Sequence, residues 1–193
     1  MSDSPAVIIG NPASIFPRHL ASLWRSLGLD AVIVTRHWSG ERVLPDGTRI
    51  LASAETESPV QRRAYRALER LLEASETRLQ VLQKRRYESA MGLETHYKPR
   101  ASPAIVDALS ISRLTRTLRP QLVCGQEVFS YGLATSLCRG CPRLVMPWGG
   151  DVYMYAETTS LAFALVKYAL RHVDLVVPGS PLAADHLKAR FGV

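Results

Sequence analysis

Short apolar runs and longer amphipathic segments alternate along this chain. The short runs are continuously apolar and predict buried strands, whereas the longer segments place apolar residues at helical spacing. The predicted strands span residues 6–10, 30–35, 121–125, 143–146 and 174–178. The predicted helices span residues 16–27, 60–90, 103–118, 131–137 and 181–191. Strands separated by helices favour a Rossmann-like α/β fold, which is an open parallel sheet with helices on both faces.

Turn residues mark the boundaries of some of these elements. Pro181 follows Ser180 at the start of the last helix, where proline suits the first helical position and serine suits the cap. Residues 43–50 contain the pair Asp46-Gly47, which favours a hairpin or a tight turn because glycine adopts positive φ angles without strain.

Polar and glycine residues follow several of the predicted strands. In open parallel sheets, ligands bind beyond the carboxyl ends of the strands. The residues that this rule brings to one rim are Asn11, Ser14, Gln126, Glu127, Trp148, Gly149, Gly150, Asp151 and Ser180. We therefore expect a ligand-binding site at this rim.

The long helical segment at residues 60–90 has one apolar stripe and one charged face. The stripe consists of Tyr65, Leu68, Leu72, Leu79 and Leu82. The charged face carries Arg62, Arg63, Arg66, Arg70, Arg78, Lys84, Arg85 and Arg86, interspersed with Glu69, Glu73 and Glu76. This face is either solvated, with ion pairs between successive turns, or it is a basic surface that contacts anionic lipid.

The net charge indicates which kind of partner the chain binds, and the apolar segments indicate where in the cell it is located. The 193 residues include 24 Lys and Arg against 17 Asp and Glu, and this net charge of +7 favours an anionic partner. The start has no signal-peptide pattern, and the apolar segment at residues 160–170 is interrupted by Lys167 and is too short to span a membrane. We therefore expect a cytoplasmic chain with one domain over residues 1–193, placed at the inner face of the membrane if the basic face binds lipid.

The cysteine spacing and the lack of nucleotide-binding motifs argue against several kinds of site. Cys138 and Cys141 have the spacing of a zinc or redox half-site, but no second pair and no nearby histidine completes it, which favours a structural role. Neither a G-x-G-x-x-G loop after the first strand nor a P-loop occurs. We expect no metal and no bound cofactor. Nucleic acid is not an expected partner either, because no reader motif accompanies the positive charge.

Four motifs together are similar to the N-terminal half of a GT-B glycosyltransferase of the family 4 type. In chain order they are GLDAVIVT, LRPQLVCGQE, PRLVMPWGGDVY and HVDLVVPGSPLAADHLKARFGV. The resemblance covers nearly the whole chain and is strongest over residues 118–193. Trp148 stands where that family often has a histidine, and the loop after the first strand lacks the glycine pair that the family often has there.

This resemblance implies transfer of a sugar from a nucleotide-sugar donor to a glycan, lipid-linked or small-molecule acceptor, with retention at the anomeric carbon and no metal. The N-terminal half would contribute mainly acceptor binding, and a C-terminal domain would hold the donor. The E-x7-E motif of that second domain is absent, because no two glutamates lie eight residues apart. We therefore expect that this chain lacks the nucleotide-sugar-binding domain and that the chain is inactive on its own.

The resemblance also suggests roles for the rim residues. Asp151 and Glu127 are the candidate catalytic residues, and the other rim residues are candidates for substrate binding. The Asp151 carboxylate would accept a hydrogen bond from an acceptor hydroxyl, or it would cap a helix that starts near Val152. Glu127 would orient the acceptor, or it would be a solvated residue at a strand end. Gly149 and Gly150 would let backbone N–H groups approach the acceptor or the donor phosphates.

A function of another class remains open at this point. The chain could be a non-catalytic Rossmann-like binding module, whose basic face contacts anionic lipid or an acidic partner. A second α/β domain that carries the E-x7-E motif would favour the transferase over this module.

Overall fold

The computed structural model describes residues 4–91, 101–157 and 159–193. Side chains are described for the same residues except 77–91 and 157. Part of the predicted charged helix therefore lies outside the described side chains, namely Arg78, Leu79, Leu82, Lys84, Arg85 and Arg86.

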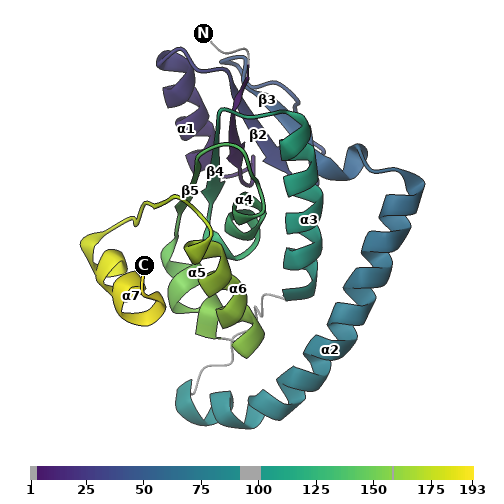
Figure 1. Cartoon of the computed structure of the whole chain (residues 1–193), viewed down its shortest axis with the longest axis vertical. Helices are drawn as coiled ribbons and strands as arrows, with labels where there is room; N and C mark the ends of the chain where they lie inside the picture. The colour runs from purple at the N-terminus through teal and green to yellow at the C-terminus, as the bar shows by residue number, and fades with distance from the viewer. Residues whose placement is uncertain (1–3, 92–100, 158) are drawn as a thin grey trace.

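Within the described residues, six parallel strands form one open sheet (Figure 1). They are β1 (Ala6–Ile9), β2 (Ala31–Thr35), β3 (Arg49–Ala52), β4 (Leu122–Gln126), β5 (Arg143–Met146) and β6 (Leu175–Val176), in the order β3-β2-β1-β4-β5-β6. Every residue of β1 and β2 is buried, which explains their continuous apolar sequences, since a parallel sheet is covered on both faces. The predicted Rossmann-like open parallel sheet is confirmed.

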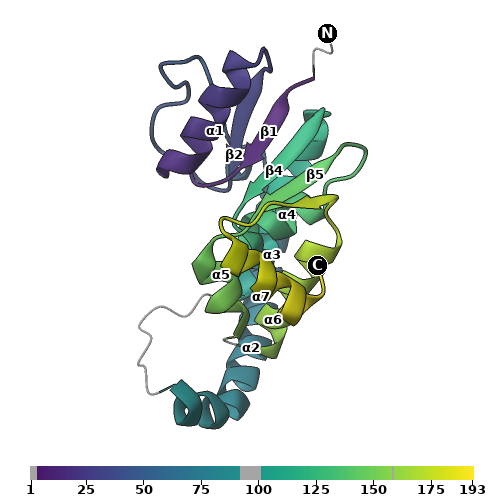
Figure 2. The same cartoon turned by 90° about the vertical axis from the view of Figure 1, so that its left-hand side faces the viewer.

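Helices cover both faces of this sheet (Figures 1 and 2). They are α1 (Ile15–Ser26), α2 (Pro59–Met91), α3 (Ala101–Thr117), α4 (Leu133–Ser136), α5 (Gly149–Tyr153), α6 (Ser160–Arg171) and α7 (Pro181–Phe191). On one face Trp24 of α1 packs with Ile8 and Ile33 of the sheet. On the other face α3, α4 and α6 bury the alternate side chains of the same strands, such as Val7 and Val32.

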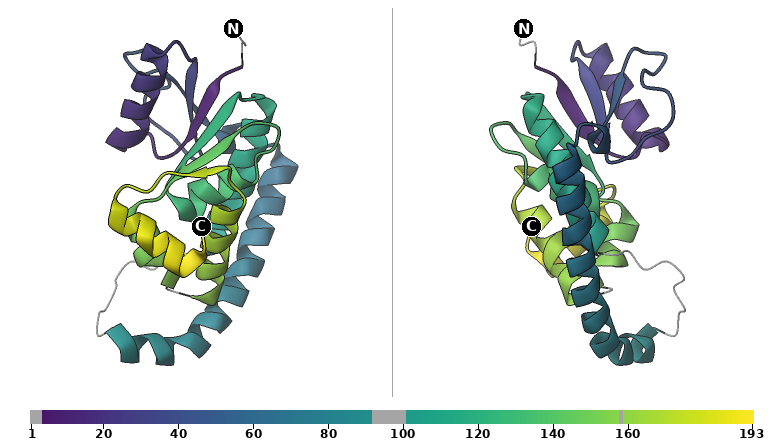
Figure 3. Two further views of the ribbon diagram at one scale, coloured as in Figure 1. Left: turned by 60° about the vertical axis from the view of Figure 1, so that its left-hand side comes forward. Right: turned by 90° about the vertical axis from the view of Figure 1, so that its right-hand side faces the viewer.

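The long helix α2 lies along the outside of α3 and extends beyond it (Figures 1 and 3). Glu76 of α2 is buried, and its carboxylate accepts hydrogen bonds from the backbone N–H groups of Ala101 (2.8 Å) and Ser102 (3.2 Å). These N–H groups have no partner inside α3 because they belong to its first turn. Glu76 therefore caps α3 from a neighbouring helix. None of the helices in the described part of the chain is both long enough and apolar enough to cross a membrane.

The first difference from the sequence predictions is at residues 43–50. The predicted turn is present, with Gly47 at a φ of +82° and an antiparallel bridge between Val43 and Arg49. The chain then continues into β3, which pairs in parallel with β2. The sequence does not reveal this strand because it is a short edge strand that begins with an exposed arginine.

Two helix predictions are also corrected. The predicted helix at residues 131–137 is a π-helical turn, η2 (Val128–Gly132), followed by the single turn of α4. The helix expected near Val152 starts earlier, at Gly149, and is only five residues long. Helices this short leave no periodic pattern of apolar residues, and glycine disfavours helix formation.

Candidate functional site

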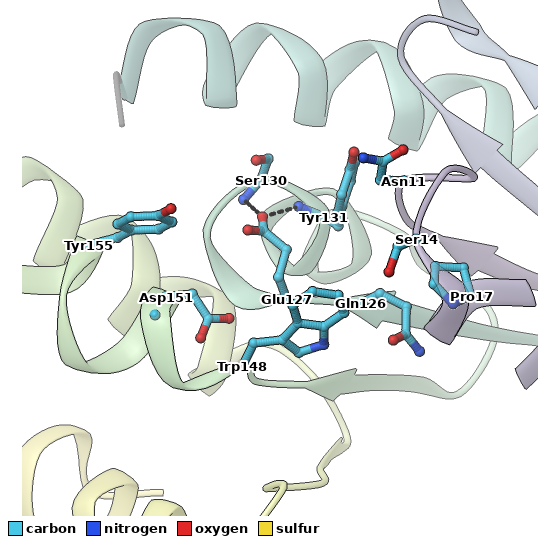
Figure 4. A pocket seen from close by; sticks show the side chains of 11 residues that line it. Asn11, Ser14, Pro17, Gln126, Glu127, Ser130, Tyr131, Trp148, Asp151 and Tyr155 are labelled. Atoms are coloured by element: carbon cyan, nitrogen blue, oxygen red, sulfur yellow. Dashed lines mark hydrogen bonds between the residues drawn. The ribbon is translucent and has the colours of Figure 1, made fainter. Parts of the chain in front are cut away.

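The candidate site is a pocket of about 370 Å³ at the carboxyl ends of β1, β4 and β5 (Figure 4). Its wall consists of Asn11, Ser14, Pro17, Gln126, Glu127, Ser130, Tyr131, Trp148, Gly150, Asp151 and Tyr155. The chain leaves β1 toward β2 on one side and later returns to β4 on the other. The pocket thus lies at the topological switch point of the sheet, which is where open α/β sheets bind ligands.

The structure brings most of the predicted rim residues into this pocket. Those in its wall are Asn11, Ser14, Gln126, Glu127, Trp148, Gly150 and Asp151. Gly149 is outside the wall and begins α5. Ser180 is also outside it: its hydroxyl accepts a hydrogen bond from the Ala183 N–H at 3.2 Å and caps α7.

Four residues of the wall were not predicted from the sequence. They are Pro17 from α1, Ser130 and Tyr131 from the turn after β4, and Tyr155 from η3 (Tyr155–Glu157). The rule that led to the rim selects only the first residues after each strand. These four residues come from the next helical turn, and the two glycines of the sequence GQEVFSYG, at the end of β4 and in the turn after it, are the sequence sign that this turn folds tightly.

Glu127 lies in this turn with a strained backbone. Its φ of +95° and ψ of 161° belong to a region that is adopted almost only by glycine, at a cost of about 1–3 kcal/mol. One carboxylate oxygen, Oε1, accepts hydrogen bonds from the backbone N–H groups of Ser130 (2.5 Å) and Tyr131 (3.2 Å), which Figure 4 marks. Burial raises the pKa of the Glu127 carboxyl, while these two N–H groups act to lower it. Glu127 is therefore not a simply solvated residue at a strand end.

Two glycines allow this turn to close. A Cβ atom on Gly132 would lie 2.8 Å from the carbonyl oxygen of Glu127, and one on Gly125 would lie 2.5 Å from Oγ1 of Thr135. Both distances are too short for a side chain. The close approach of these segments sets the backbone path that directs Glu127 toward the pocket.

Asp151 is the most buried acid in the pocket. It is 2% exposed, and its Oδ2 accepts the Val128 N–H at 2.6 Å. The cap position of α5 belongs to Trp148 rather than to Asp151, which lies in the first turn of this helix. The Asp151 carboxylate joins α5 to the turn after β4. Its other oxygen, Oδ1, is buried and has no hydrogen-bond partner in the described part of the chain. Burial raises the pKa of Asp151 to about 7, and the Glu127 charge adds to this, although backbone N–H groups act to lower it.

Trp148 supplies an aromatic surface beside these acids. Its side chain is partly exposed, and Phe16 of α1 contacts it edge to face, with ring centroids 5.0 Å apart. This contact supports the indole ring from the side of α1 and leaves part of it open to the pocket.

The described residues contain no group of three or more His, Cys, Asp or Glu side chains that could hold a metal ion. The Cys138 thiol is buried and donates to the carbonyl oxygen of Ala134 at 3.4 Å. Burial raises its pKa to about 12, so the thiol is not a reactive thiolate at neutral pH.

The chain is a Rossmann-like α/β domain with a pocket at the switch point of its sheet. The family model described as "Glycosyl transferase 4-like" matches residues 84–180, just over half of the chain, and the chain belongs to this family. This range includes the pocket residues that follow β4 and β5.

No curated protein gives a significant match to the chain. Among solved structures, the Bordetella bronchiseptica enzyme WbmG in complex with NAD and UDP is similar, with 14% sequence identity and a TM-score of 0.35. The similarity covers 92% of this chain and 52% of that enzyme. The chain therefore spans about half the length of WbmG.

The strain at Glu127 predicts an unusual order of stability among its variants. Glu127→Ala keeps the unfavourable φ angle and loses the cap, whereas Glu127→Gly also loses the cap but adopts this φ freely. We expect the glycine variant to be more stable than the alanine variant by about 1 kcal/mol or more, measured by urea unfolding. The reverse order, which is usual in helices, would show that residue 127 is not strained.

The pKa of Asp151 predicts a pH-dependent stability. The value of about 7 in the folded chain lies above the ordinary 3.8, so this carboxyl favours folding most below about pH 4 and loses that contribution as the pH rises through 7. Asp151→Asn retains an acceptor for the Val128 N–H but does not titrate. Between about pH 4 and pH 7 the original chain should lose about 2–4 kcal/mol of unfolding free energy relative to this variant. If the unfolding free energies of the original chain and of Asp151→Asn, measured in urea, changed with pH in parallel, the raised pKa would be contradicted.

Proposed function

We propose that the pocket at the switch point binds the acceptor of a glycosyltransferase, which transfers a sugar from a nucleotide-sugar donor. The observation that carries this proposal is the buried, unpaired Oδ1 of Asp151 in the pocket wall, in a chain of the Glycosyl transferase 4-like family. A buried oxygen without a partner costs about 1–3 kcal/mol, and a hydroxyl from a ligand would remove that cost. Asp151 would then orient the acceptor through one oxygen and hold the pocket wall through the other.

The remaining wall residues support a sugar-containing acceptor. Asn11, Ser14 and Gln126 bring amide and hydroxyl groups to the pocket wall, and Trp148 brings an aromatic surface to it (Figure 4). A sugar ring has hydroxyls at its edge and C–H groups on its faces, and a pocket with a few polar groups beside an aromatic wall suits both. Glu127 would act mainly by holding the turn in shape, since Oε1 is bonded to two backbone N–H groups.

The proposal assigns residues 1–193 to one acceptor-side domain and donor binding to a second α/β domain. Departure of a nucleoside diphosphate requires positioned cations or N–H groups that stabilise its negative charge. The described pocket wall includes neither lysine nor arginine, and at least three backbone N–H groups after β4 are bonded to the two acids. We therefore expect the 193-residue chain to be inactive without that second domain.

The expected result is that the 193-residue chain binds sugars but does not transfer them. Saturation-transfer NMR with a panel of methyl glycosides should detect binding, while UDP- and GDP-sugars mixed with the same glycosides should release no nucleotide above background. At pH 8, where Asp151 is mostly ionised, Asp151→Asn should weaken sugar binding about tenfold, because a hydrogen bond to a charged group contributes about 1.5–3 kcal/mol.

Glu55→Gln is the matched control, because it also converts an acid to an amide but changes an exposed side chain outside this pocket. It should bind sugars as well as the original chain does. Equal binding by Asp151→Asn would refute the assigned role of Asp151, and nucleotide release by the isolated chain would refute the need for a second domain.

The exposed arginines of α2 support a second candidate, contact with an anionic membrane. Arg62, Arg66 and Arg70 are exposed at helical spacing and form no ion pair with another described side chain. Such a row attracts anionic lipid with about 1 kcal/mol per basic residue near the surface. This contact would place the acceptor pocket near a membrane.

Sedimentation with vesicles tests the membrane contact. The chain should pellet with vesicles that contain phosphatidylglycerol and remain in solution with neutral phosphatidylcholine vesicles. Replacing Arg62, Arg66 and Arg70 by glutamine, or raising the salt to about 0.5 M, should abolish pelleting, since screening weakens exposed charges. If vesicle binding persisted after both the arginine substitutions and the increase in salt, these arginines of α2 would not contact lipid and would only be solvated.

A further inference from the structure

The candidate pocket has the opposite charge to the chain as a whole. The sequence contains 24 Lys and Arg against 17 Asp and Glu. The described wall of the pocket nevertheless includes Glu127 and Asp151 and no lysine, arginine or histidine. An anionic ligand would therefore enter a partly buried space beside two acids without meeting a charged partner, which is unfavourable.

The backbone N–H groups at this end of the sheet do not compensate for the missing cations. Turns at strand ends in α/β folds commonly bind phosphate through a run of such groups. Here the N–H of Val128 is bonded to Asp151, and those of Ser130 and Tyr131 are bonded to Glu127. The carboxylates of the protein thus occupy the positions where a ligand phosphate or carboxylate would bind.

The groups that remain for a ligand suit hydroxyls and an apolar ring face. Oδ1 of Asp151 is buried without a partner, and Ser14 makes no capping bond with its side chain. Trp148 is 39% exposed and is supported by Phe16 at 5.0 Å. In Figure 4 the carboxyl of Asp151 and the indole of Trp148 lie on the same side of the pocket.

We propose that this pocket selects sugar rings that carry no negative charge and excludes uronic acids and sugar phosphates. The inference rests on the proposed acceptor function and adds a substrate class to it. Glu127 and Asp151 exclude anions in two ways, by their own charge and by occupying the N–H donors of the turn. Trp148 acts on both kinds of sugar alike, because it stacks on C–H groups rather than on the charged substituent.

Matched pairs of sugars test the charge selection directly. Methyl glucoside and methyl glucuronoside share one ring and differ only in oxidation at C6, and the galacto and manno pairs do the same. Saturation-transfer NMR and indole fluorescence with the 193-residue chain at pH 8 give the affinity of each member. In every pair that binds, the neutral sugar should bind at least about tenfold more tightly than the acidic one, since like charges placed together are strongly unfavourable.

Isosteric variants test whether Glu127 and Asp151 cause the preference for the neutral sugar of each pair. Glu127→Gln and Asp151→Asn keep acceptors for the turn N–H groups and remove one negative charge each, so each should reduce the tenfold preference to about threefold or less. Trp148→Ala is the control: it should weaken both members of a pair and leave their ratio unchanged. Thermal unfolding of each variant verifies that it is folded.

The outcomes separate this inference from the proposed function. Sugars that bind regardless of charge, or a preference that both acid variants leave unchanged, would overturn the charge selection while retaining the acceptor role. Absence of binding by every sugar in the panel would overturn the acceptor role, and the charge selection with it. Tighter binding of the acidic members would overturn the charge selection and indicate a cationic site that the described wall does not contain.

Discussion

The hydrogen bond from the Val128 N–H to the Asp151 carboxylate joins the two loops that form the candidate pocket. Val128 begins the turn after β4, and Asp151 lies in α5 after β5. The adjacent bond from the Glu127 N–H to the Met146 carbonyl extends the β4–β5 pairing to the last residue of β5. Because these two bonds involve neighbouring residues, the position of Glu127 relative to Asp151 is determined by the sheet itself. The turn and the helix that carry the two acids are therefore attached directly to β4 and β5.

This arrangement gives a common fold an uncommon chemical character at its binding end. The parallel sheet and the switch point are general features, and they define where a ligand binds without defining which one. The charge of this pocket comes from the side chains of Glu127 and Asp151, which accept hydrogen bonds from backbone N–H groups of the turn after β4. In a basic chain, the two internal acids occupy N–H groups of the turn, and under the proposed selection this makes the edge suited to hydrogen-bond donors rather than to anions. Charge at the surface and charge in the pocket can then serve different partners.

The sequence was most informative where burial is complete. Strands β1, β2, β4 and β5 were predictable because a short, continuously apolar run bounded by turn residues is typical of a buried strand, and the strand-end rule then led to most of the pocket wall. The sequence was least informative where an element is short or where geometry decides the outcome. Edge strand β3 begins with an exposed arginine and has no continuously apolar run, helix α5 is too short to show a period, and the partner of Asp151 is 23 positions away in the sequence. Glu127 could not be recognised as strained, because positive φ is normally signalled by glycine or asparagine.

The backbone of Glu127 has a consequence at the level of the gene. Glutamate codons, GAA and GAG, become glycine codons through a change of their second base. Random mutation therefore repeatedly offers this turn the residue that its φ of +95° favours. That change would relieve the backbone strain, but it would also remove the carboxylate that accepts the Ser130 and Tyr131 N–H groups. Under the proposed function, a glutamate at this place is the residue to look for when related genes are screened, since glycine there would leave the pocket without one of its two acids.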